Sequence, residues 1–368
     1  MFEITAKEGA ARTGILHTAH GSFETPFFMP VATKGAVKHM SQELLEQSKT
    51  RVFISNALVL YFTNFDAVRA AGIHGFMNWK HGIFTDSGGF QILREGFLLS
   101  ISEIGVRYRS PFDGSRMLLK PEQAIDIQNK LGADVIMALD DVPDYAKYGN
   151  DFEKVKLATE RTYRWAERCK KAHRQKGQLL FGICQGGIFP ELRKESAKAI
   201  AELGLDGVAL GGLSIGESKE TMHAMAQLSI SRIPEDKPRY LMGLGSPEDM
   251  LEAIELGIDI FDSAFPTQNA RHGTLFTSAG KVRIGKQQYK AQLVPLDAAC
   301  SCFVCRNYTK AYLHHLFRSA EPLAKTLLSF HNIYFIQELL EQARIAIRQG
   351  KFSKFKSEFL RGYKAKEP

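Results

Sequence analysis

Eight short apolar runs constrain the fold of this chain more than any other feature. They are rich in Val, Ile and Phe, and most are followed by an amphipathic stretch long enough for a helix. The runs lie at residues 27–31, 51–55, 82–85, 134–139, 179–183, 207–210, 239–242 and 257–261. Apolar strands that alternate with helices predict a parallel sheet covered by helices, and eight such units close a (β/α)8 barrel. The sequence therefore predicts an α/β protein with a TIM barrel, and a doubly wound open sheet is the alternative.

Helix signals and two breaks in the alternation indicate how the chain is divided. Helical periodicity is clearest at 121–131, 190–203 and 246–256, each with Pro at or near the first turn and Gly just past the end. Residues 93–119 instead alternate polar and apolar side chains around a turn at Asp113-Gly114, which predicts a hairpin inserted in a barrel loop. A second break follows Thr277. We therefore expect a catalytic barrel over residues 1–277 and an appended unit with closing helices over 278–368.

Three of the five cysteines fall within six residues, at Cys300, Cys302 and Cys305. Together with His331 they would supply the Cys3His set of a structural Zn²⁺ site, which leaves no open coordination position. His314 and His315 are rival ligands. We prefer His331 because it is expected in the first turn of a helix, facing back toward the cysteine loop. A reduced cysteine cluster or a disulfide is the alternative.

Composition excludes a membrane protein and indicates an anionic partner. Each apolar run is broken by a charge or a glycine within about ten residues, too short to span a bilayer. The isolated Cys169 and Cys184 and the absence of a leader-like N-terminus indicate a reduced, cytoplasmic protein. The net charge of +8 is mild, but Lys and Arg concentrate at 154–176 and 344–366. Each basic segment has two explanations, a solvated helix face or a contact with a polyanion.

Catalytic groups of a barrel lie where its strands end, so the residue after each apolar run matters. Polar residues or glycines at these ends are Asn56, Asp86, Asp140, Asp141, Gln185, Gly211, Gly212, Gly243 and Asp262. Several carboxylates at one enclosed site suit chemistry at a sugar anomeric carbon, although a single aspartate such as Asp86 is also a common helix N-cap. Asp140, Gln185 and the Gly212 backbone offer donors and acceptors for a purine-like edge.

The chain resembles the tRNA-guanine transglycosylase family in a set of motifs that together cover nearly its whole length. They are Thr25–Thr33, Thr85–Gln91, Gly132–Asp141, Gln185–Gly187, Gly211–Glu217, Met242–Gly245, Phe261–Thr267, Cys300–Cys305 and His331–Asn332. The resemblance implies a zinc-containing barrel enzyme that exchanges guanine at the anticodon wobble position of tRNA for a 7-deazaguanine base. It implies double displacement through a covalent ribosyl-enzyme, and a homodimer.

The resemblance also implies roles for single residues. Asp262 matches the nucleophile and Asp86 the general acid/base, while Arg271 matches a tRNA-binding position. Positions that match the base-binding set are Ser87, Phe90, Asp140, Gln185, Gly212, Leu213 and Met242. The presence of both aspartates argues against a non-catalytic partner subunit. The chain ends at Pro368 with no C-terminal RNA-binding module, which argues against the type that acts on the tRNA body and for a bacterial type. The same chemistry on another polynucleotide is a further alternative.

Some positions depart from the family pattern. Residues 56–60 read Asn-Ala-Leu-Val-Leu where Asn-Thr-Tyr-His-Leu is common, and Gln268 and Ser246 replace an arginine and a lysine. Val142 follows the eukaryotic pattern, whereas Ile215 is bulkier than the glycine that makes room for queuine. A bulky side chain at position 215 excludes a large substituent more strictly than Val142 permits one. We therefore expect 7-aminomethyl-7-deazaguanine as the incoming base, with queuine as the alternative.

Overall fold

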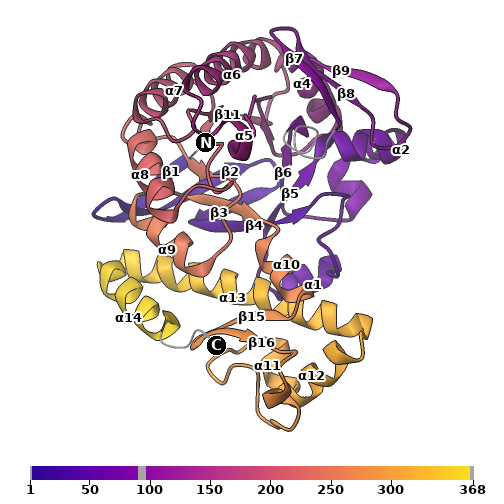
Figure 1. The fold of residues 1–368 in the computed structure, drawn as a ribbon, viewed down its shortest axis with the longest axis vertical. Coiled ribbons are helices and arrows are strands. Elements are labelled where there is room, and N and C mark those ends of the chain that lie inside the picture. The colour runs from indigo at the N-terminus through magenta and orange to yellow at the C-terminus, as the bar shows by residue number, and fades with distance from the viewer. Residues whose placement is uncertain (1, 90–96, 365–368) are drawn as a thin grey trace.

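A closed barrel of eight parallel strands forms the centre of the molecule in the computed structural model, which describes residues 2–89 and 97–364 (Figure 1). In barrel order the strands are β4 (Phe27–Ala32), β5 (Val52–Asn56), β6 (Gly82–Asp86), β10 (Val135–Met137), β11 (Leu179–Cys184), β12 (Gly207–Leu210), β13 (Arg239–Leu241) and β14 (Ile260–Ser263). β14 closes the barrel on β4 through the pairs from Ile260↔Phe27 to Ser263↔Pro30. Each strand falls on one of the eight apolar runs, so the predicted TIM barrel is confirmed and the open sheet is excluded.

Helices follow the strands and cover the outside of the barrel. They are α1 (Gln42–Gln47), α2 (Ala57–Met77), α4 (Pro121–Leu131), α5 (Tyr145–Tyr148), α6 (Phe152–Ala172), α7 (Pro190–Glu202), α8 (Lys219–Ile230), α9 (Pro247–Glu255) and α10 (Phe265–Arg271). The three helices with the clearest sequence signals are α4, α7 and α9, and all begin at the expected proline. α4 ends at Gly132, whose φ of 77° is the left-handed conformation that glycine adopts without strain.

A small antiparallel sheet covers the end of the barrel where the strands begin. It consists of β1 (Phe2–Glu8), β2 (Ala11–Thr18) and β3 (Gly21–Thr25). Phe2, Leu16 and Phe23 from this sheet belong to the same buried cluster as the inward-facing side chains of the barrel. The opposite end, where strands finish, is therefore the open end of the barrel.

The predicted insertion is present between β6 and α4. β8 (Gly105–Arg109) and β9 (Arg116–Leu119) form an antiparallel pair on either side of Asp113-Gly114, as the sequence predicted. A third strand, β7 (Leu98–Ser102), pairs with β8 and extends the hairpin to a three-stranded sheet.

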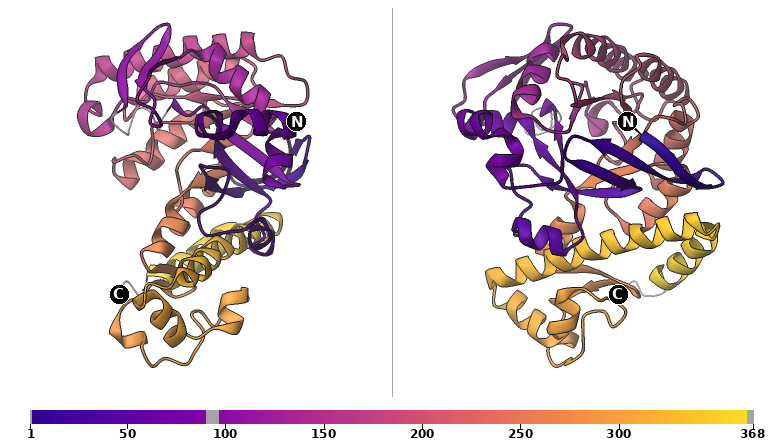
Figure 2. Two further views of the ribbon diagram at one scale, coloured as in Figure 1. Left: turned by 90° about the vertical axis from the view of Figure 1, so that its right-hand side faces the viewer. Right: turned by 180° about the vertical axis from the view of Figure 1, so that it is seen from behind.

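The C-terminal part of the chain is organised around one long helix. It contains β15 (Thr274–Thr277), β16 (Gly280–Arg283), the 3-10 helix η1 (Gln287–Tyr289), α11 (Phe303–Asn307), α12 (Lys310–Arg318), α13 (Pro322–Arg348) and α14 (Phe352–Lys364). α13 lies between the barrel and the elements from β15 to α12 (Figures 1 and 2). Gln337 and Arg344 of α13 donate hydrogen bonds to the carbonyls of Phe28 and Pro26 at 3.0 and 2.6 Å, which attaches the helix to β4. None of the helices in the described ranges is both long and apolar enough to cross a membrane.

Candidate active site

Two carboxylates from opposite parts of the sequence meet at the open end of the barrel. Asp86 is the last residue of β6, and Asp262 lies near the end of β14. The Tyr240 hydroxyl and the Gly243 backbone N–H both donate to Asp262 Oδ1, at 2.5 and 2.9 Å. Asp86 Oδ1 accepts a hydrogen bond of 3.0 Å from the Gly88 backbone N–H. The barrel therefore places two differently supported carboxylates at one site.

Burial raises the pKa of both carboxyl groups, but the two groups differ in the neighbours that add to this rise or oppose it. Burial raises the pKa of Asp86 to about 7, and the negative charges of Asp262 and Asp140 add to this rise. Burial also raises the pKa of Asp262, but the donors Tyr240 and Gly243 act in the opposite direction because they stabilise its anion. A pair of carboxyl groups whose environments differ in this way can supply one proton donor and one anion at neutral pH.

Hydrogen-bonding groups for a flat ligand come from three neighbouring strand ends. Gln185, just after β11, donates from Nε2 to Asp140 Oδ2 at 2.7 Å. Gly212, just after β12, has a φ of 65°, and a Cβ there would lie 2.3 Å from Gln185 Oε1, so a side chain at 212 would displace the amide. Burial, and then the charge of Asp141, raise the pKa of Asp140 to about 7.

Three of the other predicted base-binding residues lie just after barrel strands, at the same end of the barrel. Ser87 is buried and directly follows β6. Leu213 is also buried and lies close to the end of β12. Met242 follows β13 and packs against the inner barrel cluster. Phe90 lies outside the described residues.

Arg193 on α7 was not recognised in the sequence, yet it holds the glycine loops in place. Its side chain is fully buried and donates to the carbonyls of Gly187, Gly211 and Gly212 at 2.7, 2.8 and 3.1 Å. A buried guanidinium fixed by three carbonyls ties the loop after β11 to the loop after β12. Its only sequence signal was a basic residue on the amphipathic pattern that follows Gln185-Gly-Gly.

Tyr240 was missed for a different reason. It stands inside an apolar run and faces the barrel interior, where its ring lies edge-on to Phe84 with the centroids 6.2 Å apart. A buried tyrosine hydroxyl needs a partner, and the neighbouring strand supplies Asp262. Only the strand register reveals this pairing.

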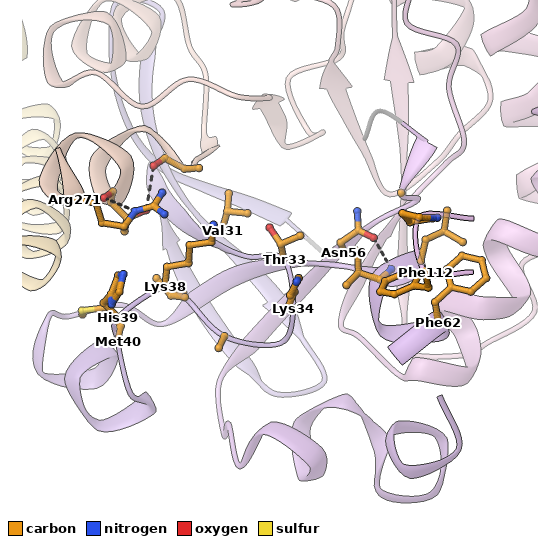
Figure 3. A pocket seen from close by; sticks show the side chains of 18 of the residues that line it. Val31, Thr33, Lys34, Lys38, His39, Met40, Asn56, Phe62, Phe112 and Arg271 are labelled. Carbon is orange, nitrogen blue, oxygen red and sulfur yellow. Dashed lines mark hydrogen bonds between the residues drawn. The ribbon is translucent and has the colours of Figure 1, made fainter. Parts of the chain in front are cut away.

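A cavity of about 840 Å³ lies between the loop after β4 and the inserted sheet, with Asn56 at the end of β5 in its wall (Figure 3). Asn56, Gly88 and Ala264, which adjoin the two carboxylates in sequence or strand register, contribute to its wall. Arg271, which was predicted to bind tRNA, also lines the cavity. The Nε of Arg271 donates to the Thr267 carbonyl at 3.1 Å.

Part of the positive charge in both basic segments is used inside the molecule. On α6, Arg161 pairs with Asp141, Arg164 with Glu103 and Arg168 with Glu122. On α14, Lys356 pairs with Glu252 and Glu255. For these residues the structure supports an intramolecular role. Lys34, Lys38 and Arg271 instead line the cavity at the open end of the barrel.

The four residues predicted to bind metal meet in the C-terminal part. His331 Nδ1 lies 4.0, 3.5 and 3.4 Å from the Sγ atoms of Cys300, Cys302 and Cys305. A tetrahedral Zn²⁺ with ordinary Zn–S and Zn–N bonds requires N···S separations of about 3.5 Å, so the residues fit this ion. All five cysteines are free thiols, which excludes the disulfide alternative.

The environment of His331 prepares Nδ1 for a metal. Nε2 lies 2.6 Å from the Phe276 carbonyl, which fixes the proton on Nε2 and leaves the Nδ1 lone pair free for an ion. The rival His314 is turned away and bonds the Ile284 carbonyl at 2.8 Å. The expected position of His331 in a first helical turn was wrong, because α13 begins at Pro322, more than two turns earlier.

A barrel with paired carboxylates at its open end, hydrogen-bonding groups at three neighbouring strand ends and a Cys3His cluster after β14 that could hold a metal ion is typical of a glycosyl-transferring α/β-barrel class. Residues 7–365 match the family model for queuine tRNA-ribosyltransferase. The chain is 47% identical to the queuine tRNA-ribosyltransferase of Halothermothrix orenii over 355 residues, covering 96% of this chain and 94% of that protein. It is also 47% identical to the protein of the same name from Geobacillus kaustophilus over 372 residues, covering 100% of this chain and 97% of that protein. The chain belongs to the queuine tRNA-ribosyltransferase family, a family of pentosyltransferase enzymes.

Proposed function

We propose that this enzyme exchanges guanine at the anticodon wobble position of tRNA for a 7-deazaguanine base, through a covalent ribosyl-aspartate. The observation that carries the proposal is the pair Asp86 and Asp262, which lie at the same open end of the barrel and are both buried, but only Asp262 is held by the Tyr240 hydroxyl together with the Gly243 N–H. An exchange at C1′ with two half-reactions needs one group that moves a proton and another that forms a bond to carbon.

In the first half-reaction, Asp262 attacks C1′ of the target nucleotide and the bond from C1′ to guanine breaks. Guanine leaves poorly as an anion, so Asp86 gives its proton to the departing base and becomes a carboxylate. In the second half-reaction, the Asp86 carboxylate takes the N9 proton of the incoming base. That nitrogen then attacks C1′ and releases Asp262, which restores both groups to their starting states.

Tyr240 and Gly243 position the nucleophile in this scheme. Both bond Oδ1 of Asp262, which leaves Oδ2 as the attacking atom. Their hydrogen bonds stabilise the Asp262 anion and oppose the rise in pKa that burial causes.

Base recognition rests on the groups at the ends of β10, β11 and β12. Asp140 and Gln185 face each other across 2.7 Å and would bond the edge common to guanine and its 7-deaza analogues. Ser87, Gly212, Leu213 and Met242 complete this pocket in the proposal, and Phe90 is assigned to it from the family resemblance alone.

The incoming base is proposed to be 7-aminomethyl-7-deazaguanine. Val142 and Ile215 line one small cavity together with Gln185 and Gly212, so both face the base-binding groups. Its volume of about 10 Å³ is close to the minimum needed to hold one water molecule. This space favours a short substituent over the cyclopentenediol of queuine.

The metal is proposed to be a structural Zn²⁺ that organises residues 278–368 as a subdomain. Asn332, next to His331 on α13, accepts from the Phe276 backbone N–H and donates to the carbonyls of Pro266 and Thr274. The metal centre is thereby connected to α10, the helix that follows Asp262 and carries Arg271. We assign the bound ion a role in tRNA docking, because four protein ligands leave no position for substrate or water.

We also propose that the enzyme acts as a homodimer in the cytoplasm. Leu293, Val294 and Leu323 on the C-terminal part are 79%, 49% and 44% exposed, which supports an apolar contact between subunits there. The free thiols Cys169 and Cys184 are compatible with a reducing compartment. Sedimentation of the intact protein tests the dimer, and Leu293→Asp should shift it toward the monomer.

Exchange of radiolabelled guanine into unmodified tRNA tests the main proposal. We expect incorporation by the intact enzyme, none by Asp262→Ala, and wild-type rates for Asp66→Ala, which changes an exposed aspartate on α2. Displacement of the label by 7-aminomethyl-7-deazaguanine or by queuine then identifies the incoming base. No incorporation by the intact enzyme would overturn the function, and activity in Asp262→Ala would overturn the nucleophile.

A further inference from the structure

A second group of potential metal ligands lies at the covered end of the barrel, where the strands begin. His20 stands in the turn between β2 and β3, His74 in the last turn of α2, and Asp134 directly before β10. One ligand atom from each of the three lies within 4.8 Å of the others. We call these residues the His2Asp cluster. Three segments that are distant in the sequence thus bring two imidazoles and a carboxylate together, on the far side of the barrel from the active-site aspartates.

Asp134 is the fixed member of the His2Asp cluster. Its side chain is fully buried, and the backbone N–H groups of His20 and Ile83 donate to Oδ1 and Oδ2 at 3.0 and 2.9 Å. A carboxylate oxygen accepts more than one hydrogen bond, so each oxygen keeps a lone pair beyond the one that the backbone uses. The backbone donors therefore hold the carboxylate in one orientation, which is how outer partners prepare a metal ligand.

The two histidines each turn one nitrogen toward this carboxylate. His20 Nδ1 lies 2.8 Å from Oδ1 of Asp134, and His74 Nε2 lies 3.0 Å from Oδ2. The imidazole rings are stacked, with centroids 3.5 Å apart and planes inclined by 16°. The His81 carbonyl oxygen lies 3.1 Å from His74 Nε2 and offers a further oxygen. Two nitrogens and several oxygens therefore converge on one small volume.

These distances fit a shared metal ion as well as they fit hydrogen bonds. Two ligands at right angles on an ion roughly 2.0–2.1 Å from each lie about 2.9 Å apart, the spacing of neighbouring ligands in octahedral or square-planar coordination. A neutral imidazole can present its lone pair at either nitrogen, because its single proton can be carried on the other one. An ordinary Asp–His pair needs one histidine only. Here a second histidine is stacked on the first and reaches the second carboxylate oxygen.

We propose that the His2Asp cluster binds a divalent late-transition-metal ion through His20 Nδ1, His74 Nε2 and the Asp134 carboxylate. Imidazole favours Ni²⁺, Cu²⁺ and Zn²⁺ over Mg²⁺ and Ca²⁺, which prefer sets of oxygens. The His20 side chain is 41% exposed, which gives the ion a path from solvent, whereas those of His74 and Asp134 are 12% and 0% exposed. The bound ion joins the β2–β3 turn to α2 and β10. The site is independent of the proposed base exchange.

Calorimetric titration of Ni²⁺ into the purified enzyme, dialysed against a weak chelator, tests the site. The wild type should bind one Ni²⁺ that His20→Gln and His74→Gln bind at least about 10-fold more weakly, since even the outer partners of metal ligands contribute 10–100-fold to affinity. Glutamine can still donate a hydrogen bond to Asp134 but is a poor ligand for Ni²⁺. The control His17→Ala changes an exposed histidine on the same hairpin and should retain the ion. All variants keep the Cys3His residues, so a difference from wild type reports the His2Asp cluster.

Thermal unfolding provides a second measurement and a control for folding. Ni²⁺ should raise the melting temperature of the wild type, because an ion that binds only the folded state stabilises it. The rise should be absent in His20→Gln and His74→Gln, and without Ni²⁺ both variants should melt within a few degrees of wild type. Excess Mg²⁺ should not displace Ni²⁺.

Three results would overturn the site. They are no Ni²⁺ binding by the wild type, wild-type affinity in both glutamine variants, and a loss in His17→Ala as large as that in His20→Gln. Displacement of Ni²⁺ by Mg²⁺ would overturn the assignment of nitrogen ligands. Guanine exchange decides the proposed function separately, since none of these measurements depends on it.

Discussion

Replacement of Tyr240 by phenylalanine tests whether the protonation states of the two aspartates drive the chemistry. The substitution keeps the ring that packs against Phe84 and removes only the hydroxyl that donates to Asp262 Oδ1 at 2.5 Å. The Gly243 N–H remains as the second donor. A hydrogen bond to a charged group contributes about 1.5–3 kcal/mol. Because 1.36 kcal/mol corresponds to one pKa unit, the pKa of Asp262 should rise by about 1–2 units.

This rise predicts a change of shape in the pH profile of kcat/KM. The acid limb reports ionisation of Asp262 and should move up by about 1–2 pH units in Tyr240→Phe. The alkaline limb reports loss of the Asp86 proton, whose pKa burial raises to about 7, and should stay in place. The bell-shaped pH profile of kcat/KM therefore becomes narrower on its acid side, and the variant loses most activity below neutral pH.

Guanine exchange measured from pH 5 to 9 provides the profile, and thermal unfolding serves as the control for folding. A melting temperature within a few degrees of wild type is expected, since the ring volume is conserved. An acid limb that does not move, or an equal loss of activity at every pH, would show that the hydroxyl does not act by stabilising the Asp262 anion.

Three further outcomes follow from the described contacts. Asp86→Asn should raise the free energy of unfolding by roughly 2–4 kcal/mol at pH 8. Folding raises the pKa of Asp86 from 3.8 to about 7, so its ionisation above pH 7 destabilises the wild-type fold, and asparagine removes this cost. Denaturation at pH 8 and at pH 4 should show that the gain vanishes at the lower pH. Gly212→Ala should raise KM for the free base at least tenfold and leave tRNA affinity intact, because the alanine Cβ would displace the Gln185 side chain. Competition kinetics measures this KM, and an unchanged value would contradict the prediction. Cys305→Ser should lower the metal content measured by elemental analysis and weaken tRNA binding. The control variant Cys169→Ser, at an isolated buried thiol, should retain the ion. Full metal content in Cys305→Ser would refute the ligand assignment.

The barrel could be predicted from the sequence because its strands are buried on both faces. Such strands appear as uninterrupted apolar runs, and all eight were found. The sheet of β1 to β3 escaped the same search because one side of it faces solvent, so that β1, Phe2–Glu8, alternates buried Phe2 with polar positions. The third strand of the insertion, β7, contains Leu98, Leu99 and Ile101, but these residues do not alternate with polar ones and the strand is mostly exposed, so neither strand pattern identified it.

The candidate site could be predicted where a polar residue interrupts an apolar run. Asp86 and Asp262 stand at such interruptions, and the cysteine spacing marks the cluster that could hold a metal ion. Tyr240 and Arg193 gave no comparable signal, because one lies within an apolar run and the other on a helix that carries many charges. Their contacts depend on strand register and on the packing of α7 against the barrel, which sequence spacing does not specify.

The anchoring of two glycine loops by Arg193 has a consequence for the direction of the reaction. Because the guanidinium fixes Gly187, Gly211 and Gly212 together, the base pocket keeps one shape through both half-reactions. A pocket of constant shape binds the departing and the arriving base by the edge that they share. In the proposed reaction, the exchange is then reversible for every base that fits beside Val142 and Ile215. Net modification of tRNA follows the supply of the incoming base and not a preference built into the protein.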